Sequence, residues 1–329
     1  MHGVTSRSPR PALTRRTLLR AAGLAALAVP ASAGLTACAS GYEDAPDPLR
    51  PLWLRAAADA KAADALGGSG PGAASAAESA RRIAAVRSAH ADALRAEVRR
   101  LNRPVDENAK PGPAQSVDDI GQLWTRLAEA AEQARRLAAE APRHRAGLLG
   151  SVSAGCAAAL QLDDSRRGDV DTGVDQVTVT TLDDDTAAAL QTALAAEHAA
   201  CWVYDLSRAF LSADYDNGLT GGWRAHAQRR DACERVLAGA GHTPVAAEAA
   251  YVPAEPVTGA ESAARVVATA ESDTAAGWHG VLERTDDATV RTLAVQCLTG
   301  AATRGVHWRR EAGIEPVVPN LPGRESVAS

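Results

Sequence analysis

Apolar residues recur every three or four positions along most of this chain, and this spacing restricts it to amphipathic helices. A clear example is the stripe formed by Ile83, Val86, Leu94 and Val98. Glycine and proline separate the periodic segments and indicate where helices end. The pattern predicts helices over residues 49–66, 74–101, 117–140, 145–162, 186–211, 222–240, 260–283 and 287–312.

The composition agrees with an all-α fold. Aromatic residues make up 3% of the chain, which contains a single Phe and a single Met. Domains rich in β-strands draw heavily on aromatic and β-branched side chains, whereas Ala, Leu, Arg and Glu favour helix. We therefore expect an all-α protein with small side chains at its helix contacts.

The predicted helices form two sets of four, which we interpret as two tandem four-helix bundles. The first bundle covers residues 49–162 and the second covers 186–313. An acidic linker over residues 163–185 separates them, and a proline-rich tail over 314–329 follows. Within the linker, residues 174–179 could be extended, and the polar residues just before the fifth helix could cap it.

The two sets of helices also resemble each other. His90-Ala91 in the second helix parallels His226-Ala227 in the sixth, and Arg145 opens the fourth helix much as Arg291 opens the eighth. This similarity favours a duplication in which the first bundle is a degenerate copy. The alternative is that any two sets of Ala-, Leu- and Arg-rich helices look alike.

The N-terminus has the parts of an export signal. A basic stretch precedes a weakly apolar run over residues 21–37, which is too short for a comfortable transmembrane helix and contains Pro30. The run ends in Leu35-Thr36-Ala37-Cys38, which resembles the lipobox of bacterial lipoproteins. That resemblance implies that a peptidase removes residues 1–37 and that a lipid is attached to Cys38. The alternative is a chance cysteine in an Ala-rich stretch.

Two further features of this region bear on location. Thr14-Arg15-Arg16-Thr17-Leu18-Leu19 resembles a twin-arginine signal, although paired arginines also occur in ordinary basic signal regions. Residues 38–48 are short and polar after Cys38, as expected of a tether. We therefore expect an extracytoplasmic protein, anchored by its lipid to the outer face of the cell membrane.

Charge and motifs exclude several function classes. The net charge is −5 and no long basic patch occurs after the signal, so nucleic acid is not an expected partner. The sequence contains no Cys-x-x-Cys, phosphate-binding loop, Gly-x-Ser-x-Gly or His-Glu-x-x-His motif.

Three helical motifs in the second bundle resemble a known family. They are Leu194-Ala195-Ala196-Glu197-His198, Trp223-Arg224-Ala225-His226 and Thr303-Arg304-Gly305-Val306-His307-Trp308. Together they are similar to a ferritin-like domain family of unknown function, found in lipoproteins of high-GC Gram-positive bacteria. The resemblance covers residues 186–313 and the tail segment 319–323, and it implies a ferritin-like four-helix bundle.

The same resemblance suggests a set of metal ligands. Glu197, His226, Glu271 and His307 match the positions that hold two metal ions in ferritin-type bundles, where Glu-x-x-His pairs complete the site. Here Trp223 and Arg304 stand three residues before the two histidines, where the pattern needs Glu. Two anionic ligands are therefore missing, and one is replaced by a cation. We interpret these residues as a degenerate site that has become a hydrogen-bonded core; a reduced site for iron or manganese is the alternative.

Four cysteines besides Cys38 lie within predicted helices: Cys156, Cys201, Cys233 and Cys297. Cys201 and Cys233 are at similar distances from the loop between the fifth and sixth helices, so they could form a disulfide across that hairpin. A buried cysteine also serves as a small apolar residue.

These observations leave two hypotheses for function. The first is a membrane-anchored lipoprotein that binds an envelope partner without catalysis and needs no cofactor. The second is a metal-handling or redox enzyme of ferritin-like type, with Fe or Mn and a reduced ligand set. The missing carboxylates favour the first, whereas twin-arginine export mildly favours the second.

Overall fold

The computed structural model describes residues 47–68, 74–100, 117–166, 174 and 177–324, and every regular element among them is helical. The first set of helices is α2 (Arg50–Gly68), α3 (Ala74–Arg100), α4 (Ile120–Glu140) and α5 (Arg143–Leu160). The second set is α6 (Asp184–Ser207), α7 (Asp216–Gly239), α8 (Ala260–Leu282) and α9 (Ala288–Glu311). Short 3-10 turns lie at η1 (Asp164–Arg166) and η2 (Ala213–Tyr215). The all-α prediction is confirmed.

Several predictions fall on residues outside this description. The signal, the twin-arginine motif, Cys38 and nearly all of the tether belong to residues 1–46, and the linker is described only in part. None of the described helices is both long and apolar enough to cross a membrane.

Most helix boundaries agree with the sequence pattern, but α7 does not. It begins at Asp216 rather than Gly222, so Gly218, Gly221 and Gly222 lie inside the helix. Gly222 has a packing role there, because a Cβ at this position would collide with the ring of Tyr204. The expected cap of α6 is confirmed, since the Asp183 carboxylate accepts from the Thr186 backbone N–H at 2.7 Å.

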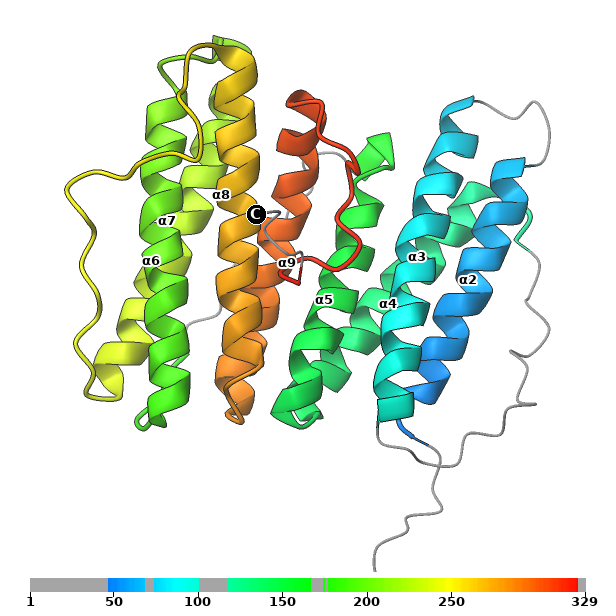
Figure 1. The fold of residues 1–329 in the computed structure, drawn as a ribbon, viewed down its shortest axis with the longest axis horizontal. Coiled ribbons are helices and arrows are strands. Elements are labelled where there is room, and N and C mark those ends of the chain that lie inside the picture. The colour runs from blue at the N-terminus through cyan, green and yellow to red at the C-terminus, as the bar shows by residue number, and fades with distance from the viewer. Residues whose placement is uncertain (1–46, 69–73, 101–116, 167–173, 175–176, 325–329) are drawn as a thin grey trace, which may run out of the picture. The chain divides into compact units, whose positions relative to one another are not determined.

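Helix α5 is buried on all sides and joins the two sets of helices. All but one of its residues from Arg145 to Ala159 are buried, as expected of a helix covered around its whole circumference. It packs against α4 on one side and α9 on the other, and Figure 1 shows α5 and α9 side by side. One hydrophobic core therefore contains Leu94, Leu149 and Leu298 together. The two sets of helices thus share one core, and the second set has a further cluster of its own that includes Val203, Val267 and Trp308.

The C-terminal strap, which we define as residues 314–324, crosses from α9 to the first set of helices (Figure 1). Its Glu315 carboxylate accepts two hydrogen bonds from Arg82 of α3, both at 3.0 Å. The carbonyl of Pro322 accepts from the Ser151 hydroxyl of α5 at 2.7 Å. Val317 and Val318 of the strap are themselves buried. The proline-rich tail is therefore an integral part of the core.

His90 connects this strap to a buried polar group in the first set. Its Nε2 lies 2.7 Å from the Asn320 carbonyl, and its Nδ1 lies 3.2 Å from an Arg87 nitrogen. A neutral imidazole with the proton on Nε2 satisfies both contacts, because it donates to the carbonyl and accepts from Arg87. Burial and the neighbouring Arg87 charge lower the pKa of His90 to about 3. The first set thus uses its histidine to hold the strap.

We predict that this neutral histidine makes the free energy of unfolding depend on pH. The unfolded chain binds a proton near pH 6.5 but folded His90 does not, so its contribution is complete above pH 6.5 and is lost as pH falls towards 3. His90→Gln keeps a donor and an acceptor without titrating. Between pH 7.5 and 4, wild type should lose about 3 kcal/mol more than this variant in urea unfolding. If the free energies of unfolding of wild type and His90→Gln changed in parallel with pH, the assignment of His90 as a buried neutral imidazole would be wrong.

Candidate functional site

Five charged side chains from four helices meet in the interior of the second set. They form the buried ionic cluster, which consists of Glu197 of α6, His226 and Arg229 of α7, Glu271 of α8 and Arg304 of α9. Four of them are at most 1% exposed and Arg304 is 7% exposed. Three of the four predicted metal-ligand positions, Glu197, His226 and Glu271, are thus brought together.

His226 lies between the two carboxylates. Its Nδ1 is 2.6 Å from Glu197 Oε2, and its Nε2 is 3.2 Å from Glu271 Oε1. An ionised carboxylate can only accept a hydrogen bond, so this geometry fits the imidazolium, which donates from both nitrogens. His226 therefore links α6 to α8 through two charge-assisted hydrogen bonds.

Glu271 is the most heavily engaged member of the cluster. Besides His226, it accepts from the Tyr204 hydroxyl at 2.5 Å and from Arg304, whose Nε and Nη2 lie 2.8 and 3.1 Å from the two carboxylate oxygens. Burial alone would raise the pKa of this carboxyl, but the charges of Arg304 and His226 hold it far below its ordinary value. Glu271 is therefore a buried, ionised carboxylate.

Glu197 and Tyr204 complete the network around it. Trp278 Nε1 donates to Glu197 Oε1 at 2.6 Å, and Trp308 Nε1 donates to the Tyr204 hydroxyl at 2.9 Å. Burial opposes ionisation of Glu197, yet His226 lowers its pKa. Burial and the Glu271 charge raise the pKa of Tyr204 well above its usual range, so this phenol stays protonated.

The two arginines leave part of their hydrogen-bonding capacity unused. Nε and Nη1 of Arg229, and Nη1 of Arg304, are buried without a hydrogen-bond partner among the described residues. Gly300 of α9 makes room for Arg229, because a Cβ there would collide with its guanidinium. Burial and the neighbouring charge of Arg304 lower the pKa of Arg229.

His307, the fourth predicted ligand, lies outside the cluster. Its side chain is 48% exposed and its ring contacts Tyr215 and Trp308. The physical reason is the rotation of α9, whose inward stripe runs through Cys297, Ala301, Arg304 and Trp308. Because His307 precedes Trp308 by one residue, it is turned by about 100° from it around the helix. The structure therefore does not bring His307 together with the other three predicted positions.

Helical spacing could have identified the residues that the ligand pattern missed. Tyr204 follows Glu197 by seven residues on α6, Trp278 follows Glu271 by seven on α8, and Trp308 follows Arg304 by four on α9. Residues at these intervals share a helix face. A search for polar and aromatic side chains on the same stripe would thus have found the whole network.

The two cysteines of the proposed disulfide, Cys201 and Cys233, are free in the structure, as are Cys156 and Cys297. The Cys233 thiol instead donates to the Leu190 carbonyl at 3.3 Å. Burial raises the pKa of Cys201 to about 12, which keeps this thiol protonated. In this structure these cysteines serve as small buried side chains.

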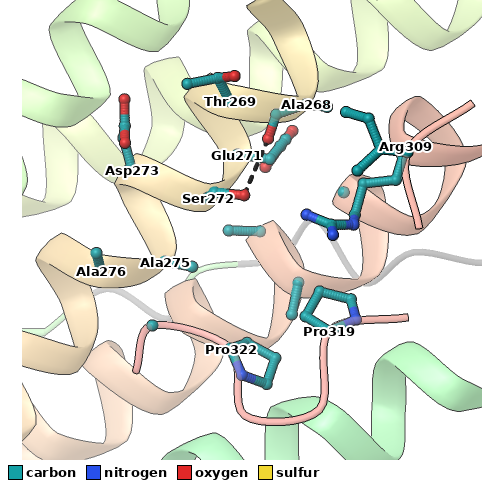
Figure 2. Close-up of a pocket in the computed structure, with 15 residues that line it drawn as sticks. Ala268, Thr269, Glu271, Ser272, Asp273, Ala275, Ala276, Arg309, Pro319 and Pro322 are labelled. Carbon is teal, nitrogen blue, oxygen red and sulfur yellow. Dashed lines mark hydrogen bonds between the residues drawn. The ribbon is translucent and has the colours of Figure 1, made fainter. Parts of the chain in front are cut away.

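Two cavities border the ionic cluster. The smaller, of about 180 Å³, lies between α8, α9 and the strap and reaches Glu271. Figure 2 shows Pro319 and Pro322 of the strap on the side of this cavity opposite Thr269 and Asp273. The larger, of about 500 Å³, lies between the start of α7 and the end of α9, and Arg304 forms part of its wall.

Comparison with known proteins places a domain on this half of the chain. Residues 189–326 match a domain of unknown function (DUF4439). Among solved structures, a conserved hypothetical protein, rv2844, from Mycobacterium tuberculosis is 31% identical, with 41% of this chain and 95% of that chain covered and a TM-score of 0.39. No curated protein matches. The chain therefore carries a DUF4439 domain, which extends beyond the predicted bundle to include the strap.

We predict that Arg304→Leu lowers the free energy of unfolding by about 3–5 kcal/mol at pH 7, because it leaves Glu271 charged and poorly paired in the interior. The paired carboxylate stabilises the fold above its ordinary pKa of 4.5, and this contribution is lost as pH falls through the depressed value. The variant should therefore lose less stability than wild type on acidification. Arg136→Leu, which removes an exposed pair with Glu132, should change unfolding by less than about 1 kcal/mol. If urea unfolding showed the same loss of free energy for Arg304→Leu and Arg136→Leu, the stabilising role of Arg304 would be wrong.

Proposed function

We propose that this chain, with its DUF4439 domain, is an exported lipoprotein held on the outer face of the cell membrane by a lipid on Cys38. Its helical body would bind an envelope partner or a ligand without catalysing a reaction. The anchor rests on the sequence: Arg15-Arg16 before a weakly apolar run, and Leu35-Thr36-Ala37-Cys38 after it. The non-catalytic role rests on the ionic cluster.

We further propose that α6 to α9 form a ferritin-like bundle in which an arginine has replaced the metal. The observation that carries this proposal is the set of donors around Glu271. Tyr204, His226 and Arg304 all donate to this carboxylate, so it has little capacity left to coordinate an ion. The guanidinium of Arg304 supplies the positive charge that would otherwise come from the metal.

Iron or manganese does not fit the residues as they are arranged. His226 uses both ring nitrogens on carboxylates, whereas a metal ligand needs one nitrogen free. Arg229 and Arg304 would repel a cation at short range. The described residues contain no group of three or more His, Cys, Asp and Glu side chains placed to hold a metal ion. A metal-handling or redox role would thus require the cluster to reorganise.

A metal measurement tests this replacement directly. The full chain, purified without chelator and incubated with Fe(II) or Mn(II), should retain less than about 0.1 equivalent by mass spectrometry. The comparison variant Arg304→Glu places a carboxylate beside Glu271 and removes a repelling charge, so it should retain several-fold more. The proposal would be wrong if the wild-type chain retained about one equivalent of Fe(II) or Mn(II), or as much metal as Arg304→Glu.

The anchor has its own test in a Gram-positive host. Wild type should be found in the membrane fraction with the added mass of a lipid, whereas Cys38→Ala should be released or stay uncut. Cys201→Ala is the matched control, because this cysteine is buried in α6. If Cys38→Ala is still processed and membrane-bound, lipid attachment at Cys38 is wrong.

A further inference from the structure

We propose that the C-terminal strap detaches from the helices in acid, because protonation of His90 releases residues 314–324 while the helices stay folded. This inference goes beyond the proposed binding role. It depends on neither the membrane anchor nor the replacement of a metal by arginine.

The strap is attached to the helices through its hydrogen-bond acceptors. Each of four pairs joins a side-chain donor on a helix to a carboxylate or carbonyl of the strap: Arg82 to Glu315, Arg309 to Pro316, His90 to Asn320 and Ser151 to Pro322. Residues 314–324 lie outside the regular elements, so no helical ladder of backbone hydrogen bonds ties them in place. A segment held in this way can open at a lower cost than unfolding of the whole protein.

His90 is the member of these four pairs whose charge changes in mild acid. The arginines stay charged and the Ser151 hydroxyl stays neutral. Arg82 holds the pKa of the Glu315 carboxyl below its ordinary value of 4.5, so this group is still ionised at pH 5. An imidazole, by contrast, ordinarily gains a proton near pH 6.5.

The surroundings of His90 accept its neutral form alone. Its Nδ1 lies 3.2 Å from Arg87 Nη1, so a hydrogen on Nδ1 would set donor against donor and cation against cation. The Arg87 guanidinium cannot simply turn away, because Asp59 accepts from its Nη2 at 2.9 Å, and Asp59 also lies 3.7 Å from Arg126. Cys156 of α5 offers no negative charge, since burial raises the pKa of its thiol. A protonated His90 must therefore leave this position.

The strap is the element that can move to let it leave. His90 is fully buried, and α5 encloses its bond to Asn320 on one side. A Cβ at Gly155 would lie only 2.6 Å from His90 Nε2 and 2.7 Å from the Asn320 carbonyl oxygen. Release of the strap would also uncover the smaller cavity, because Pro319 and Pro322 line it (Figure 2).

A second histidine, His279 of α8, also contacts the strap. A Cβ at Gly323 would lie 2.5 Å from the His279 Cβ. The charged groups around this imidazole are Glu283, Arg284 and Arg324, and Glu283 Oε1 lies 3.8 Å from its Nε2. Burial lowers the pKa of His279, so its protonation acts in the same direction as that of His90. The role of His90 is therefore measured by comparing chains that differ at His90 alone.

The size of the effect follows from the two forms of the strap. While the strap is attached, burial and the Arg87 charge lower the pKa of His90 to about 3, whereas an exposed imidazole has its ordinary value of 6.5. The released form thus binds the proton at pH values between these two, and acid favours release. From pH 7.5 to pH 5, His90 should raise the equilibrium constant for opening by about thirtyfold.

Hydrogen exchange followed by mass spectrometry tests this on the full chain carrying Cys38→Ala. Exchange of the strap amides at pH 7.5 and pH 5, corrected for the intrinsic pH dependence of exchange, gives the opening constant at each pH. His90→Gln keeps a donor for Asn320 and an acceptor for Arg87 but does not titrate. The rise in the opening constant of the parent chain should exceed that of His90→Gln by about thirtyfold.

The matched control is Ser151→Ala, which removes a strap bond that does not titrate. Its strap should open more than that of the parent chain at both pH values, with the same rise between them. An equal rise in the parent chain and in His90→Gln would overturn the role of His90. If strap amides and α5 amides of the parent chain were equally protected at pH 5, local release would be wrong, because the strap would then open only with the whole fold. That comparison needs no variant, so it holds even if His90→Gln does not fold.

Discussion

The ion pair between Arg304 and Glu271 is the interaction on which the second half of the molecule depends. A buried carboxylate is stable only with a partner, and here each of four helices contributes a charged or ionisable side chain to one network. A shift of one helix by a turn would leave charges unpaired at a cost of several kcal/mol. The cluster therefore fixes the relative heights of α6, α7, α8 and α9, which Ala-rich contacts alone would specify poorly.

The first half contains a buried ion pair of its own. There an acid on the first helix, Asp59, accepts from Arg87 on the second at 2.9 Å, and Arg87 also contacts Cys156 of α5. Arg87 precedes His90 by three residues on α3, whereas Arg229 follows His226 by three residues on α7, so the two pairs do not align. The first half differs in its histidine, which holds the strap rather than a carboxylate. Each half thus has a buried ion pair, and in the second half a histidine lies between two carboxylates.

The helices follow from local periodicity, whereas Glu197, His226 and Glu271 are indicated by the resemblance to ferritin-type ligand positions. Glu197, His226 and Glu271 lie on apolar stripes, and their convergence follows from packing those stripes together. The start of α7 could not be predicted in this way, since its glycines look like a break until the Tyr204 ring is seen against Gly222. The sequence of α5 contains an indication of the shared core that the helix pattern alone did not use. Helix α5 has no charged residue after Arg145, which indicates a helix covered on every side.

Burial of the cluster also limits what it can do. Glu197, His226 and Glu271 are almost inaccessible to solvent, so none of them can act on a substrate at the surface without opening the bundle. Arg304 differs, because it pairs with Glu271 on one side and lines the larger cavity on the other. Its Nε and Nη2 are committed to that carboxylate and its Nη1 is buried, so the charge of Arg304 serves the interior of the bundle.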